Sequence, residues 1–263
     1  MSGVFVIAEL GSCHDMSLPV AENMIATAHA CGADAVKFQY WSSAQRMADR
    51  RRAPSYLNIY KKYQIPVGWL PLLWRKAQGE GIEFMCSTYL PEDVPVVAPF
   101  VSRMKIASFE ANDVEHLSAH VEPSNAGKQI IVSMGMGADH TVVQRVLGYD
   151  VTLLHCVSAY PTPTSQLAIG RCGYYHGYSD HAGPSHTWTG ALAVAAGATI
   201  IERHMRSLVT SRMNPDYGHA MGPHDFTTYV SNVRYATKAV HYPGRYEAQP
   251  SEAAMSAFRV VIS

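Results

Sequence analysis

The sequence is short of charged residues and carries no net charge. Asp, Glu, Lys and Arg make up 16% of the 263 residues, with 21 basic and 21 acidic side chains, against roughly 25% in an average soluble domain. Proteins that bind nucleic acids or membrane surfaces usually carry an excess of basic residues, so this balance argues against both functions. Few charges also indicate that much of the chain is buried or self-associated. We therefore expect a homo-oligomer, most simply a dimer.

Long apolar runs and a cysteine framework are missing as well. The longest apolar stretches, such as 191–201, are much shorter than the roughly 20 residues of a membrane-spanning helix. The first segment, MSGVFVIAEL, lacks the basic head and the apolar body of a signal peptide. The five cysteines form an odd set without framework spacing: Cys13, Cys31, Cys86, Cys156 and Cys172. These features predict reduced thiols in a cytoplasmic protein.

The sequence does contain a repeated alternation of short apolar runs and helix-like segments. Eight runs predict strands, at 4–8, 35–38, 83–86, 103–107, 129–133, 151–155, 174–178 and 199–202. Their continuous hydrophobicity is typical of parallel strands covered on both faces. Four segments predict helices, at 19–31, 68–79, 141–147 and 185–196, and Gly32, Gly81 and Gly197 follow three of them, where a left-handed helix stop favours glycine. Eight such units in this length predict an α/β fold, a single-domain (β/α)8 TIM barrel, with a doubly wound open sheet as the alternative.

Polar and ionisable residues gather at the carboxyl ends of these runs. They are Glu9, Lys37, Gln39, Ser87, Lys105, Ser108, Ser133, Ser158, Ser179, Asp180, His181 and His204. In a barrel these ends converge on one mouth, whereas an open sheet spreads them along an edge, so the pattern favours the barrel. Lysines, a glutamine and hydroxyls at one mouth suit an anion that carries a phosphate and a carboxylate.

Two histidines end adjacent predicted strands. His181 and His204 could share a divalent metal that polarises a carbonyl group. Glu9, Glu110 and Asp180 are candidates for acid–base work or for orienting the ligands. The competing interpretation is a packed histidine after a strand, which we favour for His155 in the apolar run LLHC. The residue pattern alone predicts anion binding and metal-assisted carbon–carbon bond chemistry.

The connection between the second and third predicted strands, 41–66, is rich in basic residues. They are Arg46, Arg50, Arg51, Arg52, Lys61 and Lys62. We interpret the run as a solvated helix face. The alternative is a lid that brings positive charge to an anionic substrate.

Seven ordered sequence blocks carry a resemblance to a known family. They are IAELG at 7–11, GADAVKFQ at 32–39, KIASFE at 105–110, VSMGM at 132–136, LLHCVSAYPTP at 153–163, GYSDH at 177–181 and IERH at 201–204. Together they resemble the sialic acid (N-acetylneuraminate) synthase family of phosphoenolpyruvate-condensing TIM barrels. The resemblance implies metal-dependent condensation of phosphoenolpyruvate with an open-chain N-acyl hexosamine or related aldose, such as N-acetylmannosamine. The products would be a nonulosonic acid and phosphate.

The resemblance also implies roles for individual residues. His181 and His204 would bind the divalent metal, most often Mn²⁺, with Mg²⁺ or Co²⁺ as alternatives. Phosphoenolpyruvate would be held by Lys37, Ser87 (or Thr88, one residue on), Lys105, Ser108, Ser133, Ser158 and Ser179. The sugar side would include Glu9, Gln39, Tyr160 and Asp216, and the catalytic set Glu9, Lys37, Gln39, Lys105, Glu110 and Asp180.

The sequence departs from the family mainly on the sugar side. The segment SCHDM at 12–16 replaces an asparagine before the histidine and an Asn-Gly pair after it. Ser158 stands for a sugar-contacting asparagine, Met134 for a threonine, Tyr217 for a histidine and Ala220 for a serine. The acceptor is therefore left open. Cys13 lies near the place of a metal-binding cysteine in related aldolases, but we prefer to interpret it as a small side chain in a turn.

The predicted domain boundary also departs from the family. We expect a catalytic barrel at 1–245 and a tail at 246–263 that ends where a linker to a C-terminal antifreeze-like domain would begin. In the family that domain supplies an arginine to the sugar. A changed acceptor is the favoured explanation, and a separate protein or a basic residue of the 41–66 run are the alternatives.

Two other functions remain open from the sequence. One is a Schiff-base aldolase on the same fold, with Lys37 or Lys105 as the nucleophile. The other is a non-catalytic barrel that binds a phosphorylated metabolite or a partner.

Overall fold

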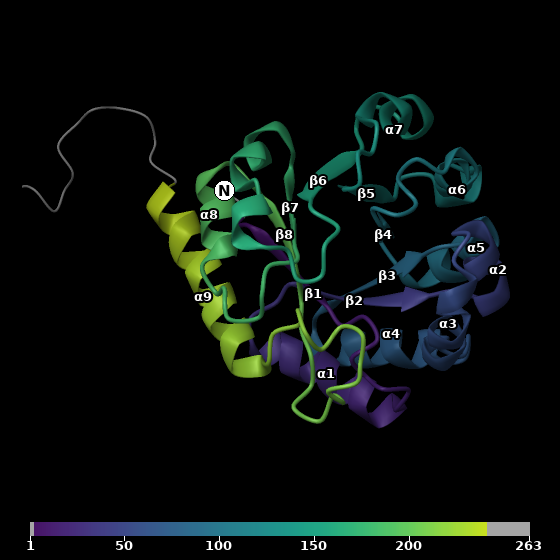
Figure 1. Cartoon of the computed structure of the whole chain (residues 1–263), viewed down its shortest axis with the longest axis horizontal. Coiled ribbons are helices and arrows are strands. Elements are labelled where there is room, and N and C mark those ends of the chain that lie inside the picture. The colour runs from purple at the N-terminus through teal and green to yellow at the C-terminus, as the bar shows by residue number, and fades with distance from the viewer. Residues whose placement is uncertain (1–2, 241–263) are drawn as a thin grey trace, which may run out of the picture.

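Eight parallel strands, hydrogen-bonded in the order of the sequence, close into a barrel in the computed structural model, which describes residues 3–240 (Figure 1). The strands are β1 Phe5–Glu9, β2 Ala35–Tyr40, β3 Glu83–Thr88, β4 Arg103–Ile106, β5 Gln129–Met134, β6 Thr152–Cys156, β7 Gly177–Asp180 and β8 Ile200–His204. Strand β1 pairs with both β2 and β8, which closes the sheet and excludes the open alternative. The predicted (β/α)8 TIM barrel is confirmed.

All eight predicted strands are present, and all except β4 run one or two residues past the predicted carboxyl end. Strand β7 runs from Gly177 to Asp180 and β8 from Ile200 to His204. The prediction ended these strands at residues 178 and 202. The residues expected just after the two strands therefore lie within them, where side chains alternate between the two faces of the sheet.

Helices cover the outside of the barrel. The α-helices are α1 Leu18–Ala30, α2 Ala44–Arg50, α3 Leu57–Tyr63, α4 Trp69–Glu80, α5 Val94–Val97, α6 Val114–His120, α7 His140–Leu147, α8 Thr189–Ala195 and α9 Pro223–Val240. The 3₁₀ turns are η1 Pro54–Tyr56, η2 Pro91–Asp93, η3 Ala98–Phe100, η4 Pro123–Asn125, η5 Thr164–Gln166 and η6 Ile169–Tyr174. The four predicted helices correspond to α1, α4, α7 and α8. The longest helix, α9, was not predicted, although Pro223 at its first position is a typical start.

Two structural details follow from glycine. Gly81 caps α4 in the left-handed conformation, with φ of 75°. Gly177 starts β7 on the barrel interior, where an added Cβ would lie 2.2 Å from the Ile200 carbonyl oxygen of the neighbouring strand. Only glycine lets β7 and β8 approach this closely.

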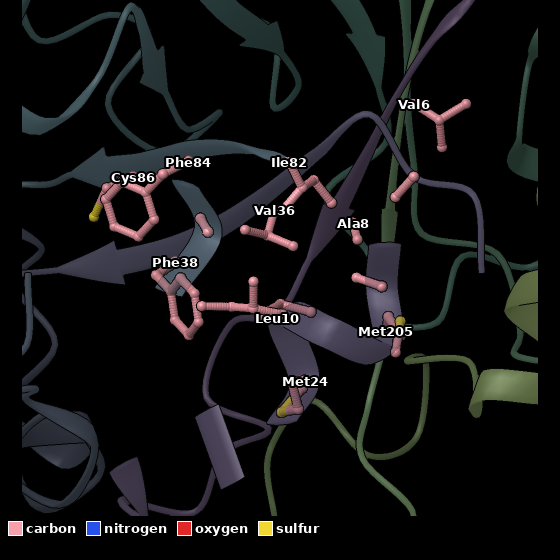
Figure 2. Close-up of a cluster of buried hydrophobic side chains, with 14 of the residues drawn as sticks. Val6, Ala8, Leu10, Met24, Val36, Phe38, Ile82, Phe84, Cys86 and Met205 are labelled. Carbon is pink, nitrogen blue, oxygen red and sulfur yellow. The ribbon is translucent and has the colours of Figure 1, made fainter. Parts of the chain in front are cut away.

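The larger part of the core lies between the outer face of the sheet and the helices. Figure 2 shows this cluster: Val6 and Ala8 of β1, Val36 and Phe38 of β2, and Phe84 and Cys86 of β3 pack with Met24 of α1. These are alternate residues of each strand, so the residues between them point into the barrel.

The interior residues form two layers. The lower layer is apolar and consists of Ile7, Ala35, Met85, Ile131, Leu154 and Ile200. The next inward position on several strands is polar and includes Glu9, Lys37, Ser87, Ser133 and Glu202. Because inward-facing and outward-facing side chains alternate along each strand, an apolar layer of side chains lies beneath a polar layer at the carboxyl ends, which we call the floor of the barrel mouth.

The predicted tail at 246–263 and the predicted boundary at 245 lie outside the described residues. Within residues 3–240, no helix combines the length and the hydropathy that a membrane span requires.

Candidate active site

A cavity of about 770 Å³ opens at the carboxyl ends of the strands. Twelve of the fifteen predicted site residues line it: Glu9, Lys37, Gln39, Lys105, Ser108, Glu110, Ser133, Tyr160, Ser179, His181, His204 and Asp216. This volume falls within the range of small-molecule sites. The structure thus brings most of the predicted residues together, while the role of each remains a prediction.

The floor of the cavity is a buried network of two lysines and two carboxylates. The Nζ of Lys37 forms an ion pair with Glu9 and lies 3.7 Å from Glu202 Oε1. The Nζ of Lys105 lies 3.7 Å from Glu202 Oε2. Since all four side chains are at most 5% exposed, their charges depend on one another rather than on water.

The network moves the pKa values of its members in different directions. Burial would raise the pKa of Glu202, but Lys105 and Lys37 outweigh it and hold this pKa below its ordinary value. Burial raises the pKa of Glu9, against the opposing charge of Lys37. Burial also lowers the pKa of Lys105, against the attraction of Glu202. Glu202 is therefore kept ionised, whereas Glu9 takes up a proton more readily.

Hydroxyl groups complete the surroundings of the lysines. Lys37 donates to Ser87 Oγ at 3.0 Å, and Lys105 donates to Ser133 Oγ at 2.8 Å. Ser179 donates to Glu202 at 3.1 Å. Each ammonium thus has a hydroxyl partner, and Ser133, which lines the cavity, can also contact a bound anion.

Two of the predicted phosphoenolpyruvate ligands do not line the cavity directly. Ser87 lies beneath it, against Lys37, and Ser158 lies 2.7 Å from the hydroxyl of Ser108. Gly135 makes room for the second pair, since a Cβ there would lie 2.3 Å from Ser158 Oγ. Thr88, the alternative to Ser87, is within 3.4 Å of His120 instead.

His181 and His204 face each other at the cavity wall, with ring centroids 5.5 Å apart. His181 Nδ1 donates to the Val157 carbonyl at 2.8 Å, because a carbonyl can only accept, and this leaves Nε2 with its lone pair. Nδ1 of His204 is buried without a hydrogen-bond partner.

The protonation of these rings also suits a metal. Burial lowers the pKa of His181 to about 4 and that of His204 further below the ordinary value. Both imidazoles are therefore neutral at pH 7, the form that binds a metal. The donor set fits a divalent transition-metal ion.

Asp216 is held at the cavity by the loop that follows β1. Its Oδ2 accepts from the backbone N–H of Ser12 at 2.8 Å and from the Ser12 hydroxyl at 2.7 Å. A Cβ at Gly11 would lie 2.4 Å from the same oxygen, so this carboxylate needs the glycine in order to reach its place. Two predicted sugar residues lie nearby: Gln39 donates to Glu9 at 2.8 Å, and the Tyr160 ring lies 4.3 Å from that of His181.

The basic run at 41–66 divides between surface and cavity. Arg51, at the end of α2, donates to Glu110 at 3.0 Å and lies over the ring of Phe109, 4.6 Å from its centroid. Arg50 pairs with Asp113 at the rim. Arg46, Lys61 and Lys62 are exposed. The interpretation as a solvated helix face is therefore wrong for Arg50 and Arg51, which line the cavity.

Asp180 does not reach the cavity. Its side chain pairs with Arg203 at 3.1 Å and accepts from the hydroxyls of Thr189 and Tyr229, with Asp180 and Arg203 both 0% exposed. The expected position was wrong because Asp180 is the last residue of β7 and not the second residue after it. Ser179 points into the barrel, so its neighbour must point out.

Glu202 and His219 line the cavity but were not singled out from the sequence, and Arg51 was named only as part of the basic run. The signal for Glu202 was present, since it precedes His204 by two residues and shares its face of β8. Arg51 and His219 lie on connections whose path no short-range pattern predicts.

Cys13, the second metal hypothesis, packs in the core at 0% exposure. Burial raises the pKa of its thiol. The preferred interpretation of a small packed side chain fits this position.

Fold and site together define a (β/α)8 enzyme barrel with a cationic, hydroxyl-lined and histidine-containing mouth. The family model described as NeuB family matches residues 24–243. The chain therefore belongs to the NeuB family, and the predicted resemblance to sialic acid synthases is confirmed, as is the prediction of an enzyme of this synthase type.

Named relatives are similar over most of their length. The pseudaminic acid synthase of Helicobacter pylori is 28% identical, over 89% of this chain and 75% of that protein. The N-acetylneuraminate-9-phosphate synthase of Homo sapiens is 26% identical, over 91% of this chain and 72% of that protein. Among solved structures, the N-acetylneuraminic acid (sialic acid) synthetase of Leptospira borgpetersenii is 27% identical with a TM-score of 0.84, covering 98% of this chain and 92% of that one.

Proposed function

We propose that this enzyme condenses phosphoenolpyruvate with an open-chain N-acyl hexosamine or related aldose, giving a nonulosonic acid and phosphate. The observation that carries the proposal is the floor of the cavity, where two buried lysines share Glu202 beside two neutral histidines. Relatives named as synthases of pseudaminic and N,N'-diacetyllegionaminic acids support the product class.

Phosphoenolpyruvate carries its phosphate and its carboxylate on the same carbon, C2. Lys37 and Lys105 each offer an ammonium, and Ser108, Ser133 and Ser179 offer hydroxyls in the same cavity. Buried ammonium groups attract an anion strongly because water screens them little. The lysine set therefore suits the enol phosphate, and the open side toward Tyr160 and Asp216 suits the sugar.

A divalent metal, for which Mn²⁺ is our first candidate, would be held by His181 and His204. Bound there, it would act as a Lewis acid on the aldehyde oxygen of the acceptor. The protein itself contributes orientation: His181 is fixed by its bond to Val157, and Asp216 by its two bonds to Ser12.

The overall reaction consumes one water molecule. A bond forms between C3 of phosphoenolpyruvate and the aldehyde carbon, water adds at C2, and the bond between C2 and the phosphate oxygen breaks. Glu202, kept ionised by the lysines, is suited to take the proton of the attacking water, and Glu9, with its raised pKa, is suited to supply one. Both carboxylates line the cavity.

The test mixes the purified chain with phosphoenolpyruvate, Mn²⁺ and a panel of aldoses that starts from N-acetylmannosamine. Phosphate release is followed together with the new carbon–carbon bond by NMR. Chelated enzyme and a His181→Ala variant are the controls. We expect metal-dependent release of phosphate and a keto acid longer than the acceptor by three carbons. Bound phosphoenolpyruvate without turnover on any aldose contradicts the proposal and leaves a binding barrel.

A Schiff-base aldolase is a second candidate because burial lowers the pKa of Lys105, as such chemistry requires. Lys105 Nζ is, however, engaged by Ser133 and by the Ile106 carbonyl. Borohydride reduction in the presence of pyruvate distinguishes the two. A covalent adduct on Lys105 that forms without metal would favour the aldolase.

A further inference from the structure

His219 lies in the same cavity as the two predicted metal ligands, on the connection between β8 and α9. Its ring centroid is 4.4 Å from that of His204 and 5.1 Å from that of Tyr160. Its side chain is buried, at 3% exposure. The cavity wall therefore carries a third imidazole that neither the sequence pattern nor the proposed function accounts for.

The nitrogen Nε2 of His219 is buried and has no hydrogen-bond partner. The nearest acidic atom is Asp216 Oδ1, at 3.8 Å, which is too long for a hydrogen bond. A buried polar atom without a partner is costly, and it is uncommon in a folded protein unless something else satisfies it. An atom bound between His219 Nε2 and Asp216 Oδ1 would satisfy both.

The free oxygen of Asp216 is also fixed in direction. Oδ2 is taken by the backbone and the hydroxyl of Ser12, so the carboxylate is oriented with Oδ1 toward His219. The backbone N–H of Asp216 donates to Asn214 Oδ1 at 3.0 Å, and Asn214 donates to the Ser12 carbonyl at 2.8 Å. A ligand held by such outer hydrogen bonds is typical of metal sites.

We propose that His219 is a further metal ligand, and that His204, Asp216 and His219 together hold a divalent transition-metal ion in the cavity. Within residues 3–240, one ligand atom from each of the three lies within 4.8 Å of the other two. Two ligands about 2.1 Å from one ion are up to about 4.2 Å apart, so the separation of 3.8 Å between Nε2 and Oδ1 needs no rearrangement.

This donor set defines the class of ion. Two imidazoles and one carboxylate prefer Co²⁺, Zn²⁺ or Fe²⁺, whereas Mg²⁺ prefers oxygen ligands and keeps its water. The inference rests on the proposed function only in placing this ion at the same mouth, because the ligands are read from the structure. It changes the expected ligand set from His181 and His204 to His204, Asp216 and His219.

The test measures metal binding rather than turnover. Co²⁺ is titrated into the metal-free protein without substrates, by calorimetry and by its visible absorption spectrum. Loss of an outer-shell partner alone costs about 10- to 100-fold in affinity, so His219→Ala is expected to lower Co²⁺ affinity by about 100-fold or more. The exposed His140, on α7, provides the control, and His140→Ala should bind as the wild type does.

A second variant shows coordination directly and does not depend on the fold of the first. His219→Cys should give a thiolate-to-cobalt charge-transfer band in the near ultraviolet, which a merely structural side chain cannot produce. Thermal unfolding of each variant checks that it folds. Wild-type affinity and spectrum in His219→Ala, or bound Co²⁺ without a thiolate band in His219→Cys, would overturn the inference.

Failure of this inference and failure of the proposed function give different results. If His219→Ala binds Co²⁺ like the wild type while turnover still needs a metal, the function stands and His219 is not a ligand. If His219 proves to be a ligand but no aldose is condensed, the metal site stands and the proposed function fails.

Discussion

Replacing Asp180 by asparagine separates a structural role from a catalytic one. Asp180 was expected among the catalytic residues, but its carboxylate lies outside the barrel against Arg203, with both side chains 0% exposed. The substitution keeps the shape and removes the charge. Arg203 then remains buried with neutral acceptors only: the new amide oxygen and the backbone carbonyls of residues 180, 183 and 219.

The expected loss of stability is large. Breaking a buried ion pair by removing one partner costs about 3–5 kcal/mol. For a chain of this size each kcal/mol lowers Tm by about 2–4 °C, so Tm should fall by roughly 10 °C. Removing Arg203 as well, in the variant Asp180→Asn with Arg203→Met, should recover part of the loss, because no charge is then left buried alone.

Urea unfolding and calorimetry measure the stability, and phosphate release well below Tm measures activity. We expect the folded Asp180→Asn variant to keep its activity within about tenfold, since loss of a general acid or base costs about 10²–10⁴-fold. Asp216→Asn is the matched control in the cavity and should show the reverse pattern. Wild-type stability together with a loss of activity beyond about 100-fold would refute the structural role of Asp180.

Three further predictions concern the floor of the cavity and the pH dependence of folding. Glu202→Gln should lower kcat by about 10²–10⁴-fold if this carboxylate takes the proton of water, and kinetics at saturating phosphoenolpyruvate that match the wild type would contradict this role. Lys105→Met should lower kcat/KM for phosphoenolpyruvate by about 10- to 100-fold, the value of a charged hydrogen bond. In the wild type, Lys128 Nζ donates to the Val101 carbonyl away from the cavity, so Lys128→Met should leave kcat/KM unchanged. Burial lowers the pKa of His116 to about 3 and that of His120 to about 4, so the unfolded chain takes up protons below about pH 6.5 that the folded chain refuses. Their stabilising contribution is complete above that pH and is lost as pH falls, by about 1.4 kcal/mol per pH unit and histidine. His116→Leu should therefore change the slope of stability against pH between pH 6 and 5 by about this amount in urea titrations, and an unchanged slope would contradict the assignment.

The ends of β7 and β8 differ from their prediction in which side chains face the cavity. The composition of GYSDH and IERH predicted two strands and a histidine after each, but the alternation of faces depends on the register, which a shift of one residue reverses. Ser179 was predicted on the correct side and Asp180 on the wrong one. Glu202 was overlooked although it shares the inner face with His204.

Long connections limited the prediction in a different way. Arg51 and His219 enter the cavity because α2 and the segment after β8 fold over its mouth. Arg51 is directed there by Glu110 and by the rings of Tyr89 and Phe109, residues far from it along the chain. No periodicity within such a connection encodes these contacts, since the partners lie on the connections that follow β3 and β4.

The sequence by itself determined the barrel and most of the polar residues at its mouth. Eight apolar runs with polar residues at their carboxyl ends allow few other folds, because parallel strands must be covered on both faces and their ends must then meet. Which of those polar residues face the cavity was decided only by the tertiary structure. Strand register turned Asp180 outward to neutralise Arg203, and the path of the last connection placed His219 beside His204 and Asp216. The orientation of Asp180 and the position of His219 depend on contacts between residues far apart in the chain. Composition and local spacing do not specify such contacts.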